Sequence, residues 1–171
     1  MTHTVSVLVE NKPGALARVS NMFARRGFNI ESLAVGPTER HDVSRIVLTV
    51  TCPAEQLEQI EKQMHKLVNV LRVSTLEAGE AVERELALVK VAAAPSRRAE
   101  LMALADVFGA RVADLGPQEM VFEVVGTPDQ LESFEELLRP HGLKELARTG
   151  RIGLARASSP ARNARPQHVL R

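Results

Sequence analysis

The stretch VSVLVENKPGALARVSNMFARRG, residues 5–27, carries the signals for a strand, a turn and a helix in direct succession. Valine at every second position from 5 to 9 predicts a strand with one strongly buried face. Pro13 suits the first turn of a helix, and Gly27 after two arginines predicts its end. Apolar residues recur between them at helical spacing, at Leu16, Val19 and Phe23.

The rest of the first half continues the pattern with two strands, a helix and a strand. FNIESLAV and SRIVLTVTC are β-rich runs joined by the polar GPTERHD, which predicts a hairpin with a longer loop. Pro53 then begins an amphipathic helix, and VNVLRVSTL closes the half as a strand. The apolar stripe of that helix is Leu57, Ile60, Met64 and Leu67.

After the small, charged joint EAGEAVERE the same order returns. Ser96 and Thr127 are placed as the caps of two further helices, between strands at LALVKVA, ARVADLG, EMVFEVVG and GLKELARTG. The second of these helices has a buried stripe at Leu131, Phe134 and Leu138. We therefore predict an α+β protein with two consecutive ferredoxin-like βαββαβ domains, each an antiparallel sheet backed by helices. The predicted ranges are domains at 1–78 and 79–156 and a disordered tail at 157–171.

Composition excludes several classes of protein. The 171 residues have 22 Lys and Arg against 21 Asp and Glu, so no overall field gathers nucleic acid or an acidic membrane. The single cysteine, Cys52, lies in a strand-like run, which indicates a buried small hydrophobe. No apolar stretch approaches the ~20 residues of a membrane span, and the N-terminus lacks a signal or transit pattern. We expect a cytoplasmic protein.

The sequence lacks the residues that the common functions of this fold require. RNA-recognition modules stack bases on aromatic side chains, but the chain has no Trp or Tyr, and three of its five Phe fall on helical core stripes. The first strand-to-helix loop, ENKPGA, has no Cys-x-x-Cys pair, and the five His are scattered. No nucleophile stands beside a base, and no Gly-rich phosphate loop occurs. We predict no catalytic residues and no metal ligands.

The loop ENKPGA instead suggests an anion site at a helix N-terminus. Pro13 has no N–H, so the free donors belong to residues such as Gly14, Ala15 and Leu16, and the missing side chain at Gly14 lets a small carboxylate approach them. The alternative is purely structural: Asn11 caps the helix, Pro13 stiffens it and Gly14 only turns the chain.

A second cue favours a ligand. GFNIESL places Asn29 at the start of the next strand, and we expect it near the same end of the sheet as Gly14. Its amide can bond an ammonium or a carboxylate. With Ile30 and Leu16 as apolar neighbours, such a site suits a small aliphatic amino acid.

Three stretches carry a family resemblance. ENKPGALARVSNMFARRGFNIESL closely resembles the opening of ACT domains, in particular that of the small regulatory subunit of acetolactate synthase, also called acetohydroxyacid synthase. EQIEKQMHKLVNVLRV resembles the end of that family's ACT domain. VERELALVKV and GLKELARTGRIGLAR resemble its second domain.

The resemblance implies a non-catalytic regulatory chain. Its partner would be a catalytic subunit that uses thiamin diphosphate, magnesium and FAD to condense two pyruvates, or pyruvate with 2-oxobutyrate, in branched-chain amino acid synthesis. The chain itself would hold no cofactor; it would activate that subunit and confer feedback inhibition by valine, or by leucine or isoleucine. The alternative is an ACT-type amino acid sensor that serves another enzyme or a transcription regulator.

The resemblance also implies where the effector lies. It would bind between the ACT domains of a homodimer. The matching positions are Asn11, Gly14, Ala15 and Leu16 of one chain and Asn29 and Ile30 of the other.

Overall fold

The computed structural model describes residues 1–158. Almost all of the predicted disordered tail, 157–171, lies outside the described residues. The described residues divide into two compact units: the first is Met1–Val82 together with residues 151–158, and the second is Glu83–Gly150.

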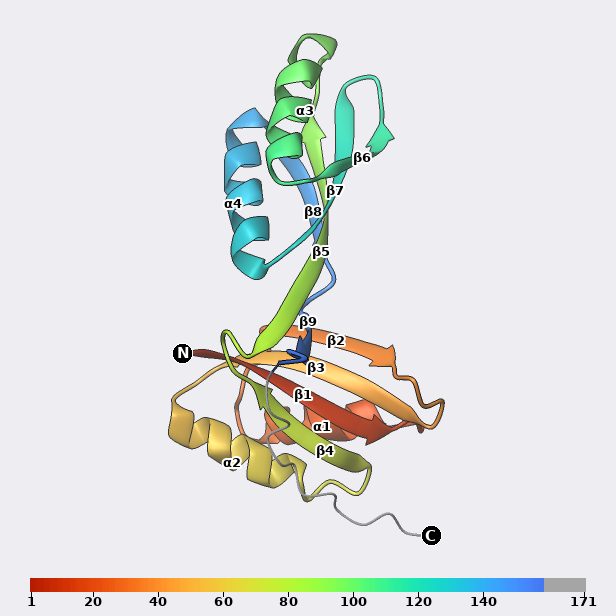
Figure 1. Cartoon of the computed structure of the whole chain (residues 1–171), viewed down its shortest axis with the longest axis vertical. Coiled ribbons are helices and arrows are strands. Elements are labelled where there is room, and N and C mark those ends of the chain that lie inside the picture. The colour runs from red at the N-terminus through yellow and green to blue at the C-terminus, as the bar shows by residue number, and fades with distance from the viewer. Residues whose placement is uncertain (159–171) are drawn as a thin grey trace. The chain divides into compact units, whose positions relative to one another are not determined.

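The first unit contains a βαββαβ run, as the sequence predicts (Figure 1). Its elements are β1 (Thr2–Glu10), α1 (Ala15–Arg25), β2 (Ser32–Pro37), β3 (Val43–Thr51), α2 (Ala54–Met64) and β4 (Val70–Leu76). The four strands form a sheet in the order β2-β3-β1-β4, with antiparallel neighbours throughout. Both helices cover one face of this sheet.

The core of the first unit follows the predicted periodicity. The odd-numbered valines of β1 are at most 2% exposed, and Val19 and Phe23 of α1 pack onto them. Ile60 and Met64 of α2 are fully buried, because an apolar residue every third or fourth position keeps one helix face on the sheet. Cys52 is 5% exposed and belongs to the same core, and this burial raises the pKa of its thiol.

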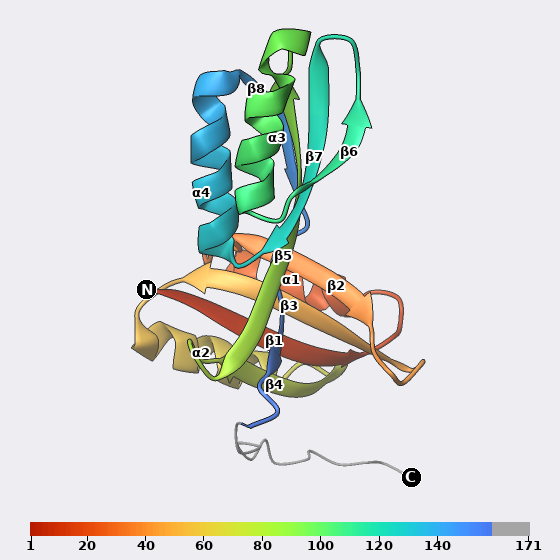
Figure 2. The same cartoon turned by 45° about the horizontal axis from the view of Figure 1, so that its top comes forward.

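The second unit repeats the order (Figure 2). Its elements are β5 (Ala81–Ala92, which begins in the first unit), η1 (Pro95–Arg97), α3 (Arg98–Val107), β6 (Arg111–Leu115), β7 (Glu119–Gly126), α4 (Pro128–Leu138), η2 (Arg139–His141) and β8 (Leu143–Arg148). The strand order is β6-β7-β5-β8, and α3 and α4 cover one face. Leu131, Phe134 and Leu138 are buried as predicted, which confirms the ferredoxin-like pattern of this unit.

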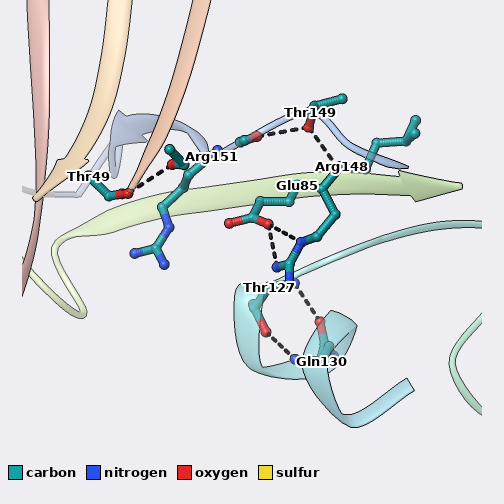
Figure 3. Close-up of polar contacts among 10 residues, drawn as sticks. Thr49, Glu85, Thr127, Gln130, Arg148, Thr149 and Arg151 are labelled. Carbon is teal, nitrogen blue, oxygen red and sulfur yellow. Dashed lines mark hydrogen bonds and ion pairs between the residues drawn. The ribbon is translucent and has the colours of Figure 1, made fainter. Parts of the chain in front are cut away.

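The two predicted helix caps have different outcomes. The Thr127 hydroxyl accepts from the Gln130 N–H at 3.3 Å, and the Gln130 side-chain oxygen accepts from the Thr127 N–H at 2.9 Å, so α4 begins with a complete capping box (Figure 3). The prediction for Ser96 is wrong. Ser96 lies inside the 3₁₀ turn η1, and α3 begins after Arg97 without a side-chain cap.

A partly buried ion pair joins two strands of the second unit that are distant in sequence. Glu85 of β5 is 6% exposed, and its carboxylate accepts from Nε of Arg148 in β8 at 2.9 Å (Figure 3). The pair links the beginning of β5 to the end of β8 within this unit.

A ninth strand, β9 (Ile152–Ala155), has no counterpart in the predicted pattern. It pairs with β5 and belongs to the first unit, whereas the sequence suggested that 79–156 forms one domain. Arg151 donates from Nη1 to the Thr4 hydroxyl at 3.1 Å and so contacts the face of the first sheet that points away from the helices. The compact units are therefore not two consecutive ranges.

Candidate functional site

The mouth of α1 is formed by a left-handed glycine. Gly14 has φ +83° and is the N-cap of a helix that begins at Ala15. The sequence suggested that Pro13 lies in the first helical turn. It lies before the helix instead, because the left-handed Gly14 that follows it interrupts the helical geometry. A Cβ added to Gly14 would meet nothing within 4 Å, so the space beside the helix mouth is open.

The first turn of α1 presents unsatisfied donors. No side chain caps it, and it contains no acidic residue. Ala15 N–H donates to the Lys12 carbonyl at 3.2 Å and is engaged in the preceding turn. Within residues 1–158, the N–H groups of Gly14, Leu16 and Ala17 have no backbone acceptor. Such donors, together with the positive end of the helix dipole, favour an anion.

Asn11 does not cap the helix. Its side-chain amide donates to the His41 carbonyl at 3.1 Å, and its backbone N–H donates to the Asp42 carbonyl at 2.7 Å. The structural alternative, in which Asn11 satisfies the first turn, is therefore wrong. These bonds hold Asn11 against the β2–β3 loop, at the end of the sheet where the helix opens.

The two apolar positions of the predicted site differ in burial. Ala15 is 5% exposed and packs into the core, whereas Leu16 is 39% exposed beside the open mouth. Of these two residues, only Leu16 therefore offers an apolar side chain to a ligand at this position.

The carboxylate of Glu10, the last residue of β1, is held by neighbours. It accepts from the Asn69 side-chain amide at 2.7 Å and pairs with Lys12 at 3.3 Å. The hydrogen bond from Asn69, followed by that from Lys12, lowers the pKa of Glu10. Lys12 thus places a cation two residues before the helix mouth.

Asn29 lies at the opposite end of the same sheet. It is exposed in the loop before β2. The first residue of β2, Ser32, pairs with Thr49, and Thr49 pairs with Thr4 near the start of β1. The prediction that Asn29 lies near Gly14 is therefore wrong for a single chain.

Topology explains this separation. The crossover through α1 returns the chain, so that β2 starts level with the start of β1. The helix mouth follows the other end of β1, at Glu10, which is six positions beyond Thr4. Since a strand rises about 3.3 Å per residue, the two parts of the predicted site are about 20 Å apart in one chain. Ile30, next to Asn29, is partly buried against the core.

The βαββαβ order of the first unit, with a helix directly after its first strand, is the order of an ACT domain, and the comparison with family models shows that the unit belongs to this class. Residues 5–72 match the family model described as the AHAS small subunit-like ACT domain. Residues 84–157 match the model described as the small subunit of acetolactate synthase.

Known proteins are similar to this chain over almost its whole length. A probable acetolactate synthase small subunit from Archaeoglobus fulgidus is 47% identical over 92% of this chain and 99% of its own. The acetolactate synthase small subunit of Mycolicibacterium smegmatis is 46% identical over 91% of each chain. The crystal structure of the small subunit from Thermotoga maritima superposes with a TM-score of 0.85 at 38% identity, covering 93% of this chain and 99% of that one. The chain belongs to the acetolactate synthase small subunit family.

Residues 1–158 contain no group of three His, Cys, Asp or Glu side chains that could hold a metal ion. None of the described helices combines the length and apolar composition required to cross a bilayer.

Proposed function

We propose that this chain binds the catalytic subunit of acetolactate synthase, raises its activity and makes it sensitive to valine. The observation that carries the proposal is the open helix mouth at Gly14 inside a small-subunit ACT domain. The chain acts through binding and not through catalysis. Thiamin diphosphate, magnesium and FAD belong to the catalytic partner.

The distance between Gly14 and Asn29 favours a site made by two chains. β2 is an edge strand of its sheet, and Val35 within it is 49% exposed. An exposed edge strand can pair with a second copy of itself. If two copies of β2 pair antiparallel, the start of the partner's strand lies beside Pro37, the end of β2.

The pairing of the strands then completes the site. Pro37 pairs with Ser44, and Ser44 pairs with Val9, at the end of β1 that leads into the helix mouth. Antiparallel pairing therefore brings the partner's Asn29 to the end of the sheet where Gly14 opens. In the homodimer, Gly14 of one chain therefore lies near Asn29 of the other, although the two residues are about 20 Å apart within one chain.

The two halves match the chemistry of an aliphatic amino acid. The free N–H groups of Gly14 and Leu16 bind the α-carboxylate, and the side-chain oxygen of Asn29 from the other chain accepts from the ammonium. Leu16 and the partner's Ile30 contact the branched side chain. Asn11 lies at the same sheet end and holds the loop that borders the pocket.

The proposal is tested by titrating the chain into the purified catalytic subunit with and without valine, while following binding and acetolactate formation. We expect saturable binding, a rise in rate, and a loss of part of that rise when valine is added. Because coupling between two ligands is reciprocal, a tenfold change in valine affinity on complex formation requires a tenfold change in subunit affinity, about 1.4 kcal/mol. If the chain neither binds that subunit nor changes its rate, it serves another partner as a generic ACT sensor.

A further inference from the structure

The face of the first sheet that points away from α1 and α2 carries two arginines in one row. Leu8 of β1 pairs with Arg45 of β3 on one side and with Arg72 of β4 on the other. Directly paired residues in a sheet project to the same face, so both guanidinium groups share the face of Leu8. Two strand spacings separate their backbones by about 10 Å. The two long side chains can therefore reach one ligand between them.

Hydroxyl groups occupy the neighbouring row. Ser6 pairs with Ser74 of β4 and is 4% exposed. Arg45 donates from Nη1 to the Ser6 hydroxyl at 2.9 Å, which holds this half-buried guanidinium in place. Glu10, two residues beyond Leu8 on the same face of β1, is the only carboxylate among the paired residues of β1, β3 and β4 on this face, and it is engaged by the Asn69 amide and by Lys12. The floor is therefore cationic and rich in donors.

Two segments form a wall beside this face of the sheet. They are residues 77–81, after β4, and residues 154–156, at the end of β9. Arg156 donates from Nε to the Gly79 carbonyl at 2.9 Å and from its backbone N–H to the Glu80 carbonyl at 2.8 Å. These bonds tie the two segments of the first unit together. The cavity that they enclose with the sheet has a volume of about 440 Å³. This size lies in the range of small-molecule sites.

The wall differs from the floor in chemistry. Leu154 adds an apolar residue to the lining beside Leu76 of the sheet, and Glu77 adds an acidic residue. An extended polyanion would meet repulsion there. A ligand with one anionic group for the floor and a neutral, hydroxyl-bearing body for the wall satisfies both parts, because carboxylates accept hydrogen bonds from hydroxyls.

We propose that this cavity binds a small phosphate monoester of a polyhydroxylated compound. The phosphate is held by Arg45 and Arg72, whose planar guanidinium groups match phosphate oxygens in bidentate geometry, and by the Ser74 hydroxyl. The hydroxyl-bearing body faces Glu77 and the apolar wall. The cavity is separate from the helix mouth at Gly14, so it gives the first unit a second ligand site of different chemistry.

The test is calorimetry of the full chain with glycerol 3-phosphate and with inorganic phosphate as probes, at constant ionic strength. We expect saturable binding of both, with the ester tighter because it also contacts the wall. Arg72 is exposed on its strand, so Arg72→Ala should leave the fold intact. It should weaken binding of both probes by at least roughly tenfold, since hydrogen bonds to charged groups are worth more than neutral ones.

Two further variants make the result decisive. Arg26→Ala removes an exposed arginine at the end of α1 and should leave binding unchanged. Arg45→Lys keeps the charge but loses the bidentate geometry, so it should weaken binding without unfolding the chain. The proposal is overturned by absence of binding at millimolar probe, or by binding that survives Arg72→Ala, or by binding that Arg26→Ala removes. Neither valine nor the catalytic subunit is present, so this outcome is independent of the regulatory proposal.

Discussion

In the proposed effector site, Gly14 is the residue on which binding should depend most directly. Aspartate tolerates left-handed backbone better than most side chains and is a good N-cap, so Gly14→Asp should place a carboxylate on the free donors of the first turn. The substituted carboxylate then occupies the position of the ligand's own. We expect the chain to fold and to activate the catalytic subunit, but calorimetry should detect no valine binding.

Gly14→Asn is the matched control for charge. It has nearly the same shape and the same tolerance of positive φ, but it carries no charge. We expect valine binding to be weakened less by Gly14→Asn than by Gly14→Asp. Undiminished valine binding by the aspartate variant would contradict the placement of the carboxylate at the helix mouth.

Asn29 tests whether the site is shared between two chains. Asn29→Ala should weaken valine binding by about 1 to 3 kcal/mol, because it leaves the ligand's ammonium without a buried acceptor. Asn21→Ala, an exposed position on α1, is the control and should bind valine as the unmodified chain does. Sedimentation should show a dimer for both variants. A monomeric Asn29 variant would make this residue part of the interface and not of the pocket.

At the scale of elements, the two helices of the second unit begin in different ways, and this predicts different sensitivities. Thr127→Ala removes the capping box of α4 and should lower the free energy of unfolding by about 1 kcal/mol. Ser96→Ala changes a residue that caps nothing and should stay within about 0.5 kcal/mol. Urea unfolding of both variants measures the difference. Equal losses would contradict the assignment of the caps.

At the scale of the whole molecule, the return of the chain to the first unit predicts the behaviour of a fragment. Residues 1–78 retain the strands and helices of the first core, so circular dichroism should show a folded fragment. They lack Arg151, whose guanidinium bonds to Thr4, a residue that is only 3% exposed. We expect a lower midpoint of thermal unfolding than for the first unit in the full chain. A fragment without helical signal would show that the core of residues 1–78 is insufficient alone.

The amino-acid sequence by itself determined the order of β1–β8 and α1–α4 and the buried faces of β1, α2 and α4. The alternating valines of β1 and the stripe of Ile60 and Met64 in α2 are local patterns with the period of their element, so they can be read without knowing the partner that covers them. The glycine at position 14 and the cap at Thr127 are equally local, since each acts on a backbone within three residues. The prediction that Ser96 caps α3 was wrong, because Ser96 lies inside the 3₁₀ turn η1 that precedes α3.

Only the tertiary structure decided which distant residues meet. The direction of the crossover sets Asn29 at the far end of the sheet from Gly14, and the strand order makes β2 an edge. Strand register brings Arg45 and Arg72 to either side of Leu8, although 27 positions separate the two arginines in sequence. β9 returns to the first unit after an entire second βαββαβ run. Such pairings depend on hydrogen bonds between strands and on burial against distant surfaces, and local periodicity carries no information about either.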